Sequence, residues 1–174
     1  MTTRMDPTLI AFGANLPAPD GSCPLMTCQA ALVALRGVQG LRFVSVSRWY
    51  RTEPIPRRPG QPDFCNGVAR FETGIDPERL LTELHDVERR FGRTRSTPNA
   101  ARTIDLDLIA IGPLVRNATA PIMPHPRMHE RRFVLEPLCD VAADWIHPIL
   151  GQSAASLRNS VAAADSQRIA LWSD

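Results

Sequence analysis

The sequence predicts an α+β fold in which helices pack on an antiparallel sheet, and three patterns support this. Four short runs are rich in β-branched, aromatic and other apolar residues, as strands are. Two amphipathic segments repeat apolar residues every three or four positions, as helices do. Their order along the chain is βαββαβ, followed by a less regular C-terminal extension. This order is typical of the ferredoxin-like fold.

The first part of the chain supplies two strands and a helix. Thr8–Gly13 is a short apolar run that ends in glycine and predicts a buried strand. Pro24–Leu35 has an apolar helical face, with proline in its first turn and Gly37 just beyond its end. Leu41–Tyr50 is rich in β-branched and aromatic residues and predicts a second strand. Residues 54–62 are proline-rich and predict a loop, because proline cannot donate to a central ladder.

The middle of the chain supplies the remaining core elements. Phe64–Phe71 predicts a third strand. Asp76 is a good N-cap and is followed by proline, so a second helix begins there and ends at Gly92. An arginine-rich loop leads to Thr103–Ile111, the predicted fourth strand. After that strand the pattern is less regular, with a further helix expected near residues 154–161.

The composition bounds the class of protein. At 174 residues, with no internal repeat or linker, the chain is expected to form a single domain over residues 1–174. All 20 basic residues are arginine, which excludes the lysines of P-loops, Schiff bases and protein-kinase sites. Any phosphate chemistry must therefore use arginine, histidine, backbone N–H groups or a metal.

Compartment and partners are inferred from cysteine usage, hydropathy and charge. The four cysteines have no metal-site spacing and are expected to be reduced thiols. The sequence has no recognisable leader and no apolar run of membrane-spanning length. A net charge of +2 is too small to indicate nucleic acid. We expect a cytoplasmic monomer with no membrane or nucleic-acid partner.

Asp105 and Asp107 are the strongest chemical signal in the chain. Side chains two residues apart in a strand leave the same face, so both carboxylates point the same way. Like charges this close repel unless a cation lies between them, and hard oxygen ligands suit Mg²⁺ together with substrate phosphates. Arg102, just before the strand, has the fork geometry that binds phosphate oxygens. The alternative is a solvated strand face that carries two acids.

Other residues around this pair suit a nucleotide and a flat ring. Arginines flank the acids, as a polyphosphate site requires, at positions 93, 95, 102, 127, 131 and 132. His125 lies between two prolines, which stiffen the backbone and direct the imidazole. Phe64 and Asn66 share a strand face that suits a heteroaromatic ring, with Phe133 as a candidate for the ring's other side. Taken singly, each of these residues could instead be structural.

Together these segments resemble a known family, the 6-hydroxymethyl-7,8-dihydropterin pyrophosphokinases of folate biosynthesis. The matching stretches follow the family's order over roughly residues 8–150, and the ordered set is specific although each stretch is weak. The resemblance implies a ferredoxin-like fold, in agreement with the βαββαβ pattern. The stretches are Ala11–Asn15, Ser47–Pro54, Gln61–Asn66, Leu80–Leu81, Val87–Glu88, Gly92–Arg95, Arg102–Leu108, Pro124–Met128 and Arg131–Leu138.

The resemblance also implies an activity and a set of roles. Pyrophosphate would pass from ATP, the co-substrate, to the hydroxymethyl group of the pterin, and AMP would leave. Two Mg²⁺ ions would be held by Asp105 and Asp107, and Arg93 and Arg102 match the arginines that assist transfer. The positions that match the family's ATP site are Glu88, Arg95, His125 and Arg131, and those that match its pterin pocket are Thr52, Phe64, Asn66 and Phe133.

The chain departs from the common family pattern at loop positions. Asn99–Ala101 stands where many members have Trp-Gly-Pro, and Pro126 stands where many have tyrosine. The loop after Thr52 carries Arg57-Arg58 in place of an early glycine. None of these changes removes a metal ligand or a transfer arginine, so we expect an active enzyme.

Three other functions are compatible with parts of the pattern. A ferredoxin-like RNA-binding module would need exposed sheet aromatics in an RNP-type pattern, which the sequence lacks. A catalytically silent nucleotide-binding relative would not need the intact aspartate pair and arginines. A Mg²⁺-dependent phosphohydrolase would consume ATP without the pterin.

Overall fold

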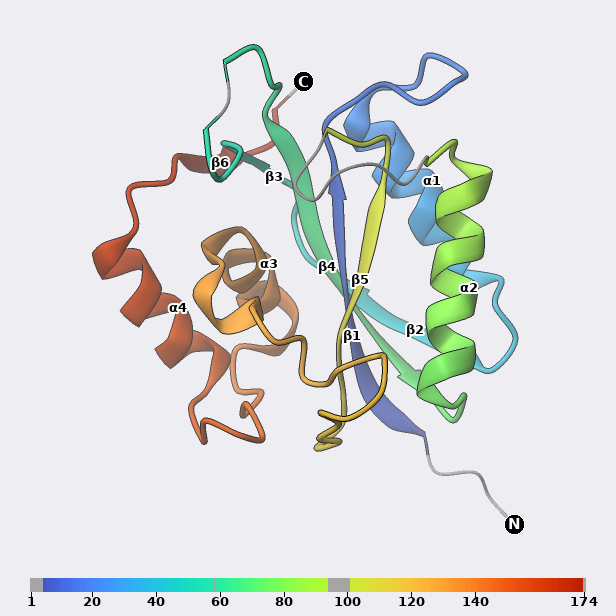
Figure 1. Ribbon diagram of the computed structural model, residues 1–174, viewed down its shortest axis with the longest axis vertical. Coiled ribbons are helices and arrows are strands. Elements are labelled where there is room, and N and C mark those ends of the chain that lie inside the picture. The colour runs from blue at the N-terminus through green and yellow to red at the C-terminus, as the bar shows by residue number, and fades with distance from the viewer. Residues whose placement is uncertain (1–4, 58, 94–100, 174) are drawn as a thin grey trace.

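The structure is a computed structural model that describes residues 5–57, 59–93 and 101–173. These residues form a six-stranded sheet with the order β5-β1-β4-β3-β6, in which β2 pairs with the far half of β4 (Figure 1). The ladders between the strands are antiparallel. The strands are β1 (Asp6–Ala14), β2 (Leu41–Val46), β3 (Tyr50–Thr52), β4 (Phe64–Thr73), β5 (Asp105–Ile111) and β6 (Ile169–Leu171).

The α-helices of the described residues cover both faces of the sheet (Figure 1). The first two pack against one face, and the last two lie over the other. The predicted ferredoxin-like βαββαβ core is confirmed, and the C-terminal extension adds the second helical layer. The helices are α1 (Pro24–Arg36), α2 (Pro77–Arg90), α3 (Arg132–Ala142) and α4 (Ala154–Ala164), with a short 3₁₀ turn, η1 (Met128–Glu130), before α3.

Local signals in the sequence fix the ends of the helices. The Asp76 side chain caps α2 by accepting a hydrogen bond of 2.9 Å from the Arg79 N–H. Gly92 lies just beyond the same helix at a φ of +76°, a left-handed conformation that glycine adopts without a steric penalty. The helix predicted near residues 154–161 is present as α4, and Ser153 caps it through the Ser156 N–H.

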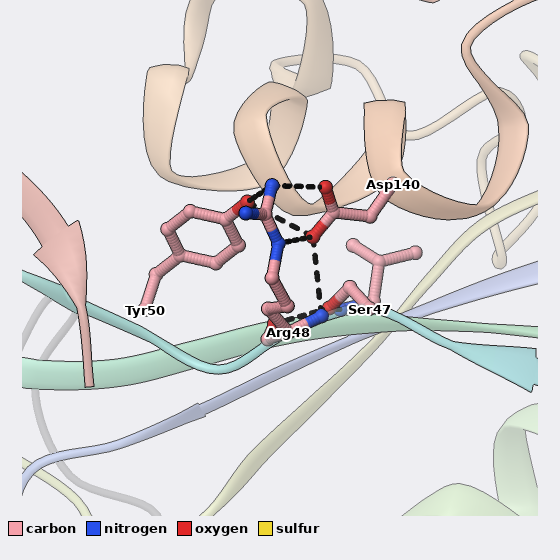
Figure 2. A network of polar contacts seen from close by, with 5 residues as sticks. Ser47, Arg48, Tyr50 and Asp140 are labelled. Carbon is pink, nitrogen blue, oxygen red and sulfur yellow. Dashed lines mark hydrogen bonds and ion pairs between the residues drawn. The ribbon is translucent and has the colours of Figure 1, made fainter. Parts of the chain in front are cut away.

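The predicted second strand, Leu41–Tyr50, is divided into β2 and β3. The reason is that the chain between them turns its polar groups toward α3. The Arg48 N–H donates to the Asp140 carboxylate at 3.1 Å instead of continuing the ladder with β4. The Arg48 guanidinium also contacts both Asp140 oxygens, and the Tyr50 hydroxyl donates to the same carboxylate at 2.9 Å. Figure 2 shows these groups converging on Asp140, so the network fastens α3 to the sheet beside β3.

The side chains of the sheet alternate between two separate apolar cores. On one face Ile10, Phe12 and Phe71 pack with α1 and α2. On the other face Leu9 and Val68 pack with residues of α3 and α4. The period-two alternation of the strands therefore supplies both layers.

Two elements, α3 and β6, are not predicted by the sequence. Pro137 lies inside α3, and an interior proline normally argues against a helix because it removes an N–H donor. Strand β6 has only three residues, too few for a pattern. Among the described residues, the structure has no helix that is both long and apolar enough to cross a membrane.

The two-core arrangement predicts that the C-terminal layer is integral to stability. Leu84→Ala in α2 and Leu135→Ala in α3 each truncate a fully buried side chain, so each should lower the free energy of unfolding by about 2–5 kcal/mol. Ile149→Ala, at a side chain that is 63% exposed, should change it by less than about 0.5 kcal/mol. Urea unfolding measures all three. A loss below about 1 kcal/mol for Leu135→Ala alone would show that the extension packs loosely.

Candidate functional site

A cavity of about 540 Å³ lies on the α3 face of the sheet, at one end of β1, β4 and β5. Strand alternation explains this position, because Asp105 and Asp107 leave β5 on the face opposite to Leu106 and Leu108, which are in the core with α1 and α2. The segment before α3 and the first turn of that helix cover the cavity on the side away from the sheet. They contribute His125, Arg127, Glu130, Arg131 and Phe133 to its lining.

Small residues on β1 make room for the carboxylates. Gly13 pairs with Asp105 and Ala11 pairs with Asp107 across the β1–β5 ladder. A Cβ atom at Gly13 would lie 3.1 Å from Asn66 Oδ1, tighter than ordinary van der Waals contact. The glycine therefore keeps both the aspartate and the asparagine open to the cavity.

The two arginines predicted to assist transfer both contact Asp105. Arg93 Nη1 lies 2.5 Å from Asp105 Oδ1, and Arg102 Nη1 is paired with Oδ2. The backbone of Arg102 is fixed by Asn15, whose Oδ1 accepts from the Arg102 N–H at 2.8 Å. Asn15 Nδ2 donates to the Pro62 carbonyl at 3.1 Å, so this buried amide ties together two loops that border the cavity.

Glu88, predicted from the resemblance to contact ATP, does not line the cavity. It is buried, and its Oε1 accepts from the Leu106 N–H at 2.8 Å and pairs with the Arg93 guanidinium. Burial raises the pKa of Glu88 to about 7. The carboxylate thus contacts the β5 backbone between the two aspartates, and its ion pair orients the Arg93 guanidinium.

Burial and charge also perturb the groups inside the cavity. Burial, followed by the charge of Asp105, raises the pKa of Asp107 to about 6. Burial lowers the pKa of His125 to about 4, and the nearby Arg131 and Arg127 act in the same direction. His125 is therefore neutral at pH 7. Its Nδ1 accepts from the Arg127 N–H at 3.2 Å, so the ring proton is on Nε2, which can donate.

The residues predicted to hold the ring lie next to the charged groups. Asn66 is buried on β4, and its Nδ2 donates to Thr52 Oγ1 on β3 at 2.7 Å. The Arg102 guanidinium lies 6.0 Å from the centre of the Phe64 ring. The Arg131 guanidinium lies 5.5 Å from the Phe133 ring. Both aromatic rings and the amide face the same cavity as the carboxylates.

The structure thus brings most of the predicted site residues to one place. Arg95 lies outside the described residues, as does most of the Asn99–Ala101 loop. The sequence did not single out Gly13, Glu53 or Glu130, which line the cavity, or Asn15, which positions Arg102. The predicted residues that line the cavity are Thr52, Phe64, Asn66, Arg93, Arg102, Asp105, Asp107, His125, Arg131 and Phe133.

Fold and cavity define a class: a ferredoxin-like α+β domain with a carboxylate pair, arginines and aromatic rings at one end of its sheet. Residues 9–143 match the family model described as 7,8-dihydro-6-hydroxymethylpterin-pyrophosphokinase (HPPK). The chain therefore belongs to the HPPK family, which confirms the resemblance seen in the sequence.

Individual relatives agree with this assignment. The chain is 35% identical over 139 residues to the 2-amino-4-hydroxy-6-hydroxymethyldihydropteridine pyrophosphokinase of Haemophilus influenzae, which covers 80% of this chain and 83% of that protein. It is 39% identical over 119 residues to the folic acid synthesis protein fol1 of Pneumocystis carinii, covering 68% of this chain and 16% of the much longer fungal protein.

A solved structure supports the fold. The wild-type HPPK-DHPS of Plasmodium falciparum superimposes with a TM-score of 0.66 at 12% identity, over 90% of this chain and 45% of that one. The present chain thus spans less than half of that protein and a small part of the fungal one.

The raised pKa of Asp107 predicts a gain in stability on neutralisation. Because the folded-state pKa is raised from 3.8 to about 6, ionising Asp107 opposes folding above pH 6, and this cost disappears as the pH falls toward 4. Asp107→Asn should raise the free energy of unfolding by about 1–3 kcal/mol at pH 8 without divalent cations. Thermal unfolding at pH 8 and pH 4 measures this, and a lower stability of the variant at pH 8 would contradict it.

Proposed function

We propose that this protein transfers the pyrophosphoryl group of ATP to the hydroxymethyl oxygen of 6-hydroxymethyl-7,8-dihydropterin, releasing AMP, as a step of folate biosynthesis. One observation carries the proposal: a single cavity is lined by a carboxylate pair, arginines and two aromatic rings, Phe64 and Phe133. Membership of the HPPK family supports it. An RNA-binding role has no comparable support, because two adjacent carboxylates would repel a phosphate backbone.

The donor set of the cavity fits Mg²⁺. Asp105 and Asp107 offer hard oxygen ligands from one strand face, opposite residues too small to block them. The described residues contain no group of three or more His, Cys, Asp and Glu side chains that could hold a metal alone. The remaining ligands must then come from water and phosphate oxygens, as is usual for Mg²⁺. Two Mg²⁺ ions bound there with ATP would neutralise phosphate charge and orient the transferred group.

The ion pairs of Asp105 suggest how Arg93 and Arg102 come to contact the phosphates of ATP. Both Arg93 and Arg102 now neutralise this carboxylate. Once a divalent cation neutralises it, their guanidiniums can turn to the phosphate oxygens, where charge develops during transfer. Glu88 pairs with the same Nη1 atom of Arg93 and would keep this guanidinium near the strand during the change.

The part of the cavity lined by Phe64, Asn66 and Phe133, called the ring end below, suits the pterin. Asn66 can donate to and accept from the edge of the ring, and its bond to Thr52 fixes the orientation of the amide. Phe64 and Phe133 would contact the two faces of the ring. The substrate hydroxyl is then the nucleophile: its oxygen bonds to the β-phosphorus, the bond from that phosphorus to the oxygen of AMP breaks, and the hydroxyl proton is released. No covalent intermediate with a side chain is required, so catalysis rests on positioning and charge.

The triphosphate end has its own donors. Neutral His125 can donate from Nε2, and Arg131 supplies a guanidinium from the turn before α3. We place the nucleotide beside these two residues, with Arg95 as a further contact. We also propose that the protein acts as a monomer in the cytoplasm, where ATP is available.

The product distribution tests the proposed reaction. The protein should form AMP from Mg²⁺-ATP only when the dihydropterin is present. Asp105→Asn and Asp107→Asn should each lower kcat by about a hundredfold or more, because the charge that holds the metal is lost. Quantifying AMP and ADP by chromatography decides between alternatives. ADP would indicate a single-phosphate kinase or hydrolase, and no turnover by folded protein would indicate a silent relative.

Separate substitutions test the proposed ring slot, which is the space for the pterin between Phe64 and Phe133. Asn66→Ala should raise the Kd for the pterin by about tenfold or more, since a buried amide that reads the ring edge is lost. Phe64→Tyr should keep stacking and leave the Kd within about threefold, whereas Phe64→Ala should weaken binding by about tenfold. Pterin fluorescence titration with a non-hydrolysable ATP analogue measures all three. Equal affinities of Phe64→Ala and wild type would place the ring elsewhere.

A further inference from the structure

The C-terminal segment, residues 165–173, lies against the ring end of the cavity. It leaves α4 and returns to the sheet, where β6 pairs with β3 and Thr52 is opposite Ile169 (Figure 1). The Trp172 N–H donates to the Trp49 carbonyl at 2.8 Å, and the Arg51 guanidinium lies 4.5 Å from the centre of the Trp172 ring. The segment lies outside residues 9–143, the part that matches the family.

Arg57 pairs with one carboxylate oxygen of Glu53, the residue after Thr52, and the C-terminal segment binds the other polar groups of Glu53. The Glu53 N–H donates to the Arg168 carbonyl at 3.2 Å, and its Oε2 accepts from the Arg168 N–H at 3.3 Å. Its own carbonyl accepts from Gln167 Nε2 at 2.6 Å. Glu53 is buried and lines the cavity, so these bonds fix one wall of it.

Gln167 also contacts the opposite wall. Its backbone carbonyl accepts from Arg132 Nη1 at 3.3 Å, and Arg132 lies between Arg131 and Phe133 at the start of α3. Gln167 is only 6% exposed, and the orientation of its side-chain amide is fixed because a carbonyl such as that of Glu53 can only accept. One residue therefore joins the wall that carries Thr52 to the wall that carries Phe133.

We propose that Gln167 is a positioning residue that sets the width of the ring slot. The proposal rests on the proposed placement of the pterin between Phe64 and Phe133. Gln167 does not line the cavity and does not touch the substrate. It acts through Glu53 and Arg132, because the distance between the two walls decides whether the amide of Asn66 and the ring of Phe133 reach the pterin together.

The test is Gln167→Met in the full chain, which keeps the side-chain length and removes the amide donor. Among the described residues the Gln167 Oε1 atom has no hydrogen-bond partner, so the substitution removes only the bond to the Glu53 carbonyl, and Tm should fall by no more than about 4 °C. The Kd and KM for the pterin should rise roughly three- to tenfold. The KM for ATP should rise less, by no more than about twofold, because among the proposed ATP contacts in the cavity only Arg131 lies beside Arg132, and the carboxylates and His125 do not depend on this contact.

Gln152→Met is the matched control, an exposed glutamine in the same part of the chain, and should match wild type in every measurement. An unchanged pterin Kd in Gln167→Met, or equal rises in the KM of both substrates, would overturn the proposal. If Gln167→Met folds poorly, Arg132→Met removes the separate bond between the Gln167 backbone carbonyl and the start of α3, and it should show the same selective rise. Unchanged pterin binding in Asn66→Ala would instead mean that the pterin placement is wrong, which separates the two failures.

Discussion

The chemistry of this protein depends on the alternation of β5. Leu106 and Leu108 enter the core with α1 and α2, so Asp105 and Asp107 must face the other side of the sheet. A shift of one residue in register would bury both carboxylates in an apolar core, where ionised groups are very costly. The same packing that stabilises the sheet therefore also fixes the two carboxylates proposed to bind metal, and the site needs no separate scaffold for them.

To form a cavity, the face of the sheet that carries Asp105 and Asp107 must also be covered, and α3 covers it. The helix is held to the sheet by Asp140, which accepts from Arg48 and Tyr50 on the other side of the interface. The turn before α3 and its first residues bring Arg131 and Phe133 over the carboxylates. A ferredoxin-like core alone would leave this end of the sheet open to water. The C-terminal extension, which contains α3, covers it and so forms the cavity.

Much of this could be predicted from the sequence, since it rests on local rules. The periodicities, the Asp76 cap and the Asp-x-Asp spacing act over a few residues, and the structure confirms the elements they predicted. What could not be predicted rests on contacts between distant residues. Asn15 binds the Arg102 backbone across 87 positions, and Gln167 binds Glu53 across 114. Helix α3 contains Pro137, a residue that disfavours a helix interior, so tertiary packing overrides local propensity there.

The charges of the site are consistent with the proposed binding of a polyanion together with its cations. Asp107 and Glu88 both have a raised pKa, so near pH 7 their ionised forms oppose folding. The arginines compensate for this only in part: Arg93 pairs with both Glu88 and Asp105, and Arg102 pairs with Asp105. In the proposed complex, a bound cation would favour the ionised aspartates, and bound phosphate would accept the released guanidiniums. Ligand binding would thus relieve a cost that the folded protein carries, at the groups proposed to act in transfer.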